Sequence, residues 1–123
     1  MLLNNFFTIT NKEQISDNET VTDIKINHKH EIFNGHFPNN PVVPGVVSVQ
    51  MINEILSDHL NLKLMVSKAK NIKFANMINP KTNQILNFNI EYSTTEDNNY
   101  KVNAKIFFEH TIFLKFNGIF SII

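Results

Sequence analysis

Hydrophobic residues follow two different periods along the chain, and the changes of period indicate where elements begin and end. Alternation at every second position, typical of a strand, covers residues 20–27, and a mixture of apolar and β-favouring residues covers residues 2–10. The polar segment 11–19 predicts a connection between these two strands. A loop with prolines at 38, 41 and 44 follows, and regular helix is disfavoured before each of them.

Residues 45–60 repeat apolar side chains every three or four positions, which predicts one helix. Pro44 stands just before it, where proline is well tolerated because the first helical amides have no internal acceptor. Apolar side chains cover much of the circumference of this helix, so the helix is expected to be buried. The remaining polar side chains, each near the next along one face, are Gln50, Asn53, Glu54 and Ser57.

Four further β-patterned segments complete the chain, at residues 63–78, 84–95, 100–110 and 112–122. Short polar connections between them are typical of hairpins. The order of two strands, one helix and four strands, without repeat or linker, predicts a single domain over residues 1–123. Its expected class is α+β, with an antiparallel sheet of about six strands wrapped around one central hydrophobic helix.

Composition narrows the classes of function. Eleven lysines balance eleven acidic residues without forming a basic tract, which argues against a nucleic-acid partner. The absence of cysteine excludes disulfides, thiolate catalysis and cysteine-bearing zinc sites. The possible ligands His28, His30, Glu31 and His36 lack the spacing of a metal site, so none is expected. No signal peptide is recognised and no apolar run approaches the ~18 residues of a membrane span, so a soluble, cytoplasmic protein is expected.

The loop before the helix carries two motifs, Gly35-His36-Phe37-Pro38 and Pro41-Val42-Val43-Pro44-Gly45-Val46. Together with the order of elements, they resemble the hotdog-fold 3-hydroxyacyl-acyl-carrier-protein dehydratases of bacterial fatty-acid synthesis. Residues 69–74, 79–80 and 85–88 are similar to that family's third strand, turn and fourth strand, so the resemblance covers nearly the whole chain. It implies elimination of water from a 3-hydroxyacyl thioester to give a trans-2-enoyl product. No metal or dissociable cofactor is implied, because the substrate is carried on the phosphopantetheine of acyl carrier protein.

The chemistry of this elimination can be assigned to residues. A base must remove the proton beside the carbonyl, and histidine, with an unperturbed pKa of about 6.5, suits the task; His36 is the candidate. Charge developing on the thioester oxygen needs donors in place, and the unpaired amides at a helix start supply them at Gly45 and Val46. Glycine also allows close approach of the thioester. The resemblance adds Phe37 to the substrate-binding residues.

Gln50 departs from the family pattern, which carries glutamate or aspartate fourteen positions after the histidine. A glutamine can hold a hydroxyl or a water but cannot give up a proton at neutral pH. Three outcomes remain open: His36 acts alone, Glu54 one turn further on supplies a carboxylate through water, or the protein binds acyl chains with little turnover. Loss of a general acid costs ~10²–10⁴-fold in rate, which predicts a slower enzyme more readily than an inactive one.

Assembly and alternative functions complete the predictions. A six-stranded sheet around one helix leaves two edges, so a homodimer is expected. The resemblance implies that His36 faces Gln50 of the partner subunit, and some family members form trimers of dimers. Acyl carrier proteins are acidic as a class, which makes Lys68, Lys70 and Lys73 candidates for contacting one. The alternatives are a catalytically inactive acyl-thioester-binding hotdog subunit, paired with an active homologue, and a hotdog acyl thioesterase.

Overall fold

The computed structural model describes residues 1–34 and 41–123. Its strands are β1 (Phe7–Ser16), β2 (Glu19–Ile26), β3 (Leu64–Phe74), β4 (Ile85–Thr94), β5 (Tyr100–Phe108) and β6 (Thr111–Ile122). The long helix is α1 (Gly45–Leu60), and a single 3-10 turn, η1 (Glu31–Phe33), precedes it in the described part of the chain. Helix α1 has the bounds that its hydrophobic period predicts. No helix among the described residues is long and apolar enough to cross a membrane.

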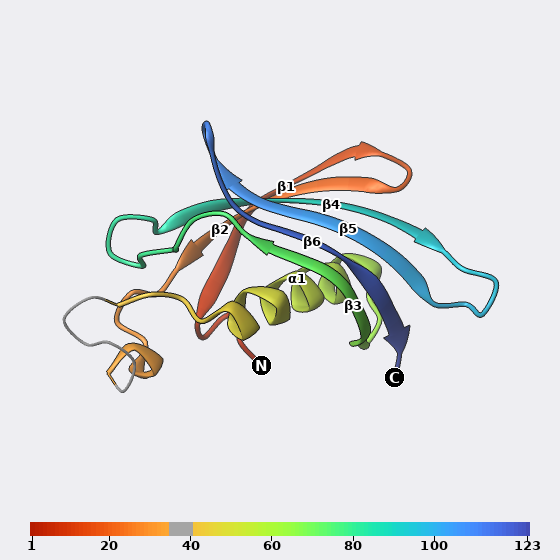
Figure 1. Ribbon diagram of the computed structural model, residues 1–123, viewed down its shortest axis with the longest axis horizontal. Helices are drawn as coiled ribbons and strands as arrows, with labels where there is room; N and C mark the ends of the chain where they lie inside the picture. Colours follow the sequence, from red (N-terminus) through yellow and green to blue (C-terminus); the bar gives the residue numbers. More distant parts are fainter. Residues whose placement is uncertain (35–40) are drawn as a thin grey trace.

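The strands form one antiparallel sheet in the order β1-β2-β4-β5-β6-β3, and the sheet arches over α1 (Figure 1). Hairpins connect β1 to β2, β4 to β5 and β5 to β6. The segment containing α1 instead carries the chain from β2 to β3, at the opposite edge of the sheet. This arrangement confirms the predicted α+β class, with a six-stranded sheet wrapped around one helix.

The core lies between the concave face of the sheet and α1. Every second residue of the central strands points toward the helix, as shown by the full burial of Leu86, Phe88 and Ile90 along β4. The helix meets them with Met51, Ile52, Ile55 and Leu56, each at most 1% exposed. Full burial of an aliphatic or aromatic side chain contributes about 1.5–3 kcal/mol, so this layer stabilises the fold substantially. Phe113, Phe116 and Phe120 extend this core, each at most 4% exposed.

The first strand is displaced from its predicted position. The sequence predicts a strand over residues 2–10 and a connection over 11–19, but β1 spans Phe7–Ser16. Its outer half is polar and mostly exposed, yet it pairs with β2 from Asn11↔Asp23 to Ser16↔Glu19. Backbone pairing and polar contacts such as the ion pair between Lys12 and Asp58 sustain this end of the hairpin, because its side chains have little apolar surface to bury. The pattern of side chains therefore could not reveal it.

Residues 75–78 leave the sheet where the sequence predicts that the third strand continues to residue 78. β3 ends at Phe74, although Ala75 N still donates to Phe113 O at 2.9 Å. Further along, Val43 N donates to Ile78 O at 2.9 Å, so the loop before α1 is tied to the connection between β3 and β4. This diverging connection leaves a space beside the first turn of the helix.

Candidate active site

The first turn of α1 begins with backbone amides that have no acceptor among the described residues. Pro44 is the N-cap, in an extended conformation with φ −60° and ψ 143°, and its side chain cannot cap the helix. Its carbonyl accepts from Val47 N at 3.0 Å and Ser48 N at 3.1 Å. The amides of Gly45 and Val46 precede the first helical hydrogen bonds and lie at the positive end of the helix dipole. Both residues thus lie where an anionic oxygen is best stabilised; their role in substrate binding stays a prediction.

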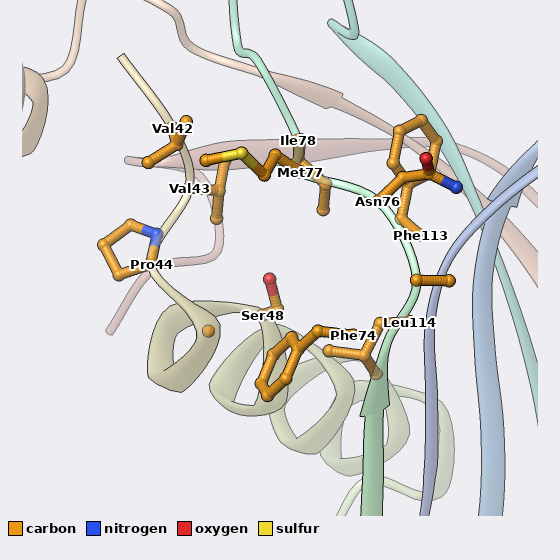
Figure 2. Close-up of a pocket in the computed structure, with 12 residues that line it drawn as sticks. Val42, Val43, Pro44, Ser48, Phe74, Asn76, Met77, Ile78, Phe113 and Leu114 are labelled. Carbon is orange, nitrogen blue, oxygen red and sulfur yellow. The ribbon is translucent and has the colours of Figure 1, made fainter. Parts of the chain in front are cut away.

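A cavity of about 380 Å³ lies beside this turn (Figure 2). Its walls come from the loop before α1, the connection after β3 and the start of β6. They are largely apolar, through Val42, Val43, Pro44, Phe74, Met77, Ile78, Phe113 and Leu114. Asn76 also lines it, but its side-chain amide donates to Ile112 O at 2.8 Å. Such a volume and lining are typical of a small-molecule site.

Phe74 and Gly45 are in close contact at the mouth of the cavity. A β-carbon added to Gly45 would lie 2.7 Å from two carbons of the Phe74 ring. Phe74 is nevertheless 60% exposed. Its ring therefore lies against Gly45 but is not locked in the core and can turn aside. Glycine at position 45 therefore permits this aromatic wall and leaves the adjacent amides uncovered by a side chain of their own.

Gln50 and Glu54 lie on another face of α1 and line a different cavity, of about 530 Å³. Gln50 Nε2 donates to Glu54 Oε2 at 3.0 Å. The Glu54 carboxylate also accepts from Leu2 N, at 2.8 Å to Oε1 and 3.0 Å to Oε2, and from Leu3 N at 2.8 Å. Glu54 is 7% exposed, so its carboxylate holds the N-terminal segment against the helix.

Within one subunit the structure thus separates two groups of predicted site residues. Gly45 lines the cavity at the start of α1, whereas Gln50 and Glu54 line the other. Val46 is 77% exposed, and the residue one turn after it on that open side is Gln50, which is also exposed. His36 and Phe37 lie outside the described residues. The roles predicted for all these residues stay predictions.

The sequence did not single out Ser48, Met77 or Ile78 as residues of a site. Ser48 lies among the apolar positions of the helix, and Met77 and Ile78 fall within the strand predicted over residues 63–78. Met77 and Ile78 line the cavity because residues 75–78 diverge from the sheet, and no local sequence pattern signals this divergence.

His30 has a structural role: its Nδ1 accepts a hydrogen bond from Ile32 N at 3.0 Å, and its ring contacts the Phe6 ring edge-on. Among the described residues no group of three or more histidines, aspartates or glutamates is placed to hold a metal ion.

A six-stranded sheet around one helix, with an apolar cavity at the helix start, defines a protein of the hotdog fold. The chain belongs to the ApeI-like family, whose model, described as ApeI dehydratase, matches residues 11–111. This confirms the dehydratase-type hotdog family that the loop motifs indicated.

Two curated relatives carry the name 3-hydroxyacyl-[acyl-carrier-protein] dehydratase FabZ. The protein from Ehrlichia chaffeensis (strain ATCC CRL-10679 / Arkansas) is 26% identical over 107 residues, covering 82% of this chain and 75% of that protein. The protein from Lactococcus lactis subsp. lactis (strain IL1403) is 40% identical over 40 residues, which are 32% of this chain and about a quarter, 26%, of its own length.

Solved structures support the same fold. The dehydratase heterocomplex ApeI:P from Xenorhabdus doucetiae matches with a TM-score of 0.72 at 17% identity, covering 92% of this chain and 96% of the other. yhdA from Lactococcus lactis, assigned provisionally as a thioesterase, matches with a TM-score of 0.65 at 12% identity, covering 94% and 91%. At these identities the likeness establishes the fold alone.

Proposed function

We propose that the protein is a dehydratase that eliminates water from a 3-hydroxyacyl thioester carried on acyl carrier protein. The observation that carries the proposal is the first turn of α1, where the amides of Gly45 and Val46 have no acceptor among the described residues and Gly45 lines a largely apolar cavity. Such a site can hold the thioester oxygen at the amides and an acyl chain in the cavity. Membership of the ApeI-like family and the two FabZ relatives support the reaction class.

The proposed reaction follows from this placement. His36 removes a proton from C2, and the electron pair of the C–H bond delocalises onto the thioester oxygen as an enolate. Negative charge that develops on the thioester oxygen is stabilised by the amides of Gly45 and Val46. The enolate pair then forms the C2–C3 double bond as the C3–O bond breaks, and the departing hydroxyl takes a proton from the His36 imidazolium to leave as water. Gln50 of the partner subunit would hold this hydroxyl by a hydrogen bond without supplying the proton.

A dehydration assay tests the proposal. The purified chain is incubated with 3-hydroxyacyl thioesters of several chain lengths on acyl carrier protein, and the trans-2-enoyl product is measured. Native protein is expected to form it, and His36→Ala to reduce the rate by at least ~10²-fold through loss of the base. Absence of turnover above background with every chain length contradicts the proposal. Release of free acid in the same assay would instead identify a thioesterase.

A second candidate is an acyl-thioester-binding subunit without turnover of its own, paired with an active homologue. The hydrogen bond from Gln50 to Glu54 favours it, because the position of the family's acid carries an amide that is already engaged with its own helix. The heteromeric assembly of the ApeI:P structure gives a precedent within the fold. Affinity purification of the tagged chain from its native cell tests this: recovery of a second hotdog subunit with a carboxylate at the equivalent position supports it, whereas recovery of self-association alone favours the homomeric enzyme.

Self-association as a homodimer is supported by the edge of the sheet at β3. Its outer edge has no neighbouring strand in the described part of the chain, and Met65 and Phe74 along it are 48% and 60% exposed. Exposed strand edges with apolar side chains favour pairing with another chain. Sedimentation equilibrium distinguishes a monomer, a dimer and a trimer of dimers.

Acyl carrier protein, the proposed carrier of the substrate, is supported by charge. The three adjacent strands β3, β6 and β5 carry six lysines and no acidic residue. On the face turned away from the helix, Lys73 pairs with Lys115 and Lys115 with Lys105, which places one lysine beside the next across three strands. We call these three residues the lysine row. A cationic surface of this kind attracts an acidic partner.

A further inference from the structure

Ser48 places a hydroxyl group in the wall of the cavity at the start of α1. It lies on the buried side of the helix, 2% exposed, and its oxygen points into the space bounded by Val43, Met77 and Phe74 (Figure 2). Asn76, the other polar side chain of the lining, is held by Ile112 O. The Ser48 hydroxyl is therefore the polar group that the described walls direct at a molecule inside the cavity.

The distance along the helix from Gly45 to Ser48 suits a particular substrate. Three residues correspond to a rise of ~4.5 Å, and residues three apart lie on the same side of a helix. A 3-hydroxyacyl thioester carries two oxygens on carbons separated by one further carbon, with C–C bonds of about 1.5 Å. With its carbonyl oxygen at the Gly45 amide and its chain in the cavity, its hydroxyl comes within reach of the Ser48 side chain.

Gln50 does not offer this contact within the same subunit, because it lines the other cavity and donates to Glu54. We propose that Ser48 hydrogen-bonds the C3 hydroxyl of the substrate and so positions the leaving group in the cavity at the start of α1. This inference rests on the proposed function, since it takes the 3-hydroxyacyl thioester as the ligand. A hydroxyl can both donate to and accept from the substrate, so Ser48 orients the C3–O bond without acting as the acid.

Binding of two matched ligands tests the inference apart from turnover. The probes are a 3-hydroxyacyl pantetheine amide and the same amide without the hydroxyl, titrated by calorimetry. Native protein is expected to prefer the hydroxylated probe, and Ser48→Ala to lower that affinity about three- to tenfold, the value of one neutral hydrogen bond. Affinity for the probe without the hydroxyl should not change. Ser48→Thr should keep the preference, and Ser57→Ala, on the same helix but in the other cavity, should leave both affinities as in the native protein.

The outcomes separate this inference from the proposed function. Dehydration by the native chain with an unaltered preference in Ser48→Ala overturns the role of Ser48 and leaves the dehydratase intact. A Ser48-dependent preference without turnover supports the role of Ser48 and favours the non-catalytic subunit. Equal loss of affinity for both probes in Ser48→Ala would show that the Ser48 hydroxyl affects only the shape of the helix or the cavity, and this outcome overturns the inference. Failure of the native chain to bind either probe overturns both proposals.

Discussion

The side-chain amide of Gln50 donates a hydrogen bond to Oε2 of Glu54, 3.0 Å away and one helical turn further along α1. Glu54 in turn accepts from the backbone amides of Leu2 and Leu3. The position at which the family's pattern carries an acid therefore belongs to a network that fastens the start of the chain to the central helix. Substitutions in this network are expected to change the rate of dehydration and the free energy of unfolding by different amounts.

Gln50→Glu is expected to raise the rate of dehydration by about 10²-fold, the lower range for a general acid, because it restores a proton donor. The same change removes the donor to Glu54 and places two carboxylates one turn apart, which should lower the free energy of unfolding by about 1–2 kcal/mol. Product formation and urea denaturation measure the two effects. Gln50→Ala is the control, since it loses the hydrogen bond without gaining an acid; a gain in rate there, or none in Gln50→Glu, contradicts the explanation.

Glu54→Ala is expected to lower the free energy of unfolding by about 3 kcal/mol, because it leaves amides in a partly buried region without their charged acceptor. Asp58→Ala is the matched control on the same helix. Its ion pair with Lys12, at 2.7 Å between Nζ and Oδ2, joins side chains that are 51% and 37% exposed. Such a surface pair contributes at most about 1 kcal/mol. Equal losses in the two variants, measured by urea denaturation, would show that Glu54 does not anchor the N-terminal segment.

Alanine substitutions at Gly118 and Gly45 should differ in their effect on stability. A β-carbon on Gly118 would lie closer than any packing distance allows to the backbone carbonyl of Lys68 on the neighbouring strand, where β3 is bulged. A backbone atom cannot rotate away, so Gly118→Ala should destabilise the fold by about 3 kcal/mol or more through overpacking. Its thermal unfolding midpoint would show this directly.

Gly45→Ala meets only the ring of Phe74, which is exposed and can turn aside. The variant should therefore unfold within about 1 kcal/mol of the native protein but dehydrate more slowly, because the added methyl group and the displaced ring obstruct the amides at the start of α1. Phe74→Ala in the same background should recover part of the rate. A Gly45→Ala protein that is as unstable as Gly118→Ala would contradict this assignment.

Charge reversal in the lysine row should weaken use of a carrier-bound substrate. Lys115→Glu is expected to lower kcat/KM about tenfold for the acyl carrier protein thioester at low salt, with a smaller loss at high salt where screening is strong. The same activity on a pantetheine thioester should not change. Because Lys115 lies between Lys73 and Lys105, the reversal relieves like-charge repulsion and should not unfold the sheet. Lys25→Glu, on β2 at the other side of the sheet, is the control; equal losses in both variants would exclude a specific role for the row.

The fold class, the bounds of α1 and the approximate place of most strands can be predicted from the amino-acid sequence. Each follows from a hydrophobic period that local backbone geometry imposes. The loop motifs around Pro41–Gly45 also indicated the family, and the family match over residues 11–111 confirms it. The roles of His36, Gly45, Val46 and Gln50 remain predictions, because a motif names residues without placing the substrate.

Other features depend on contacts between distant parts of the chain, which no hydrophobic period encodes. The pairing of β1 beyond Ile9 depends on β2 and its register, since those side chains bury little apolar surface. The role of Glu54 as an anchor depends on hydrogen bonds from the backbone amides of Leu2 and Leu3, which are 52 and 51 residues away in the sequence. The helix pattern places Ser48 among apolar positions and Gln50 among polar ones. The cavity that Ser48 lines is formed by the packing of residues 75–78, and the cavity that Gln50 lines is formed by the packing of the N-terminal segment. Those contacts join distant parts of the chain, so their geometry is fixed only when the sheet closes over the helix.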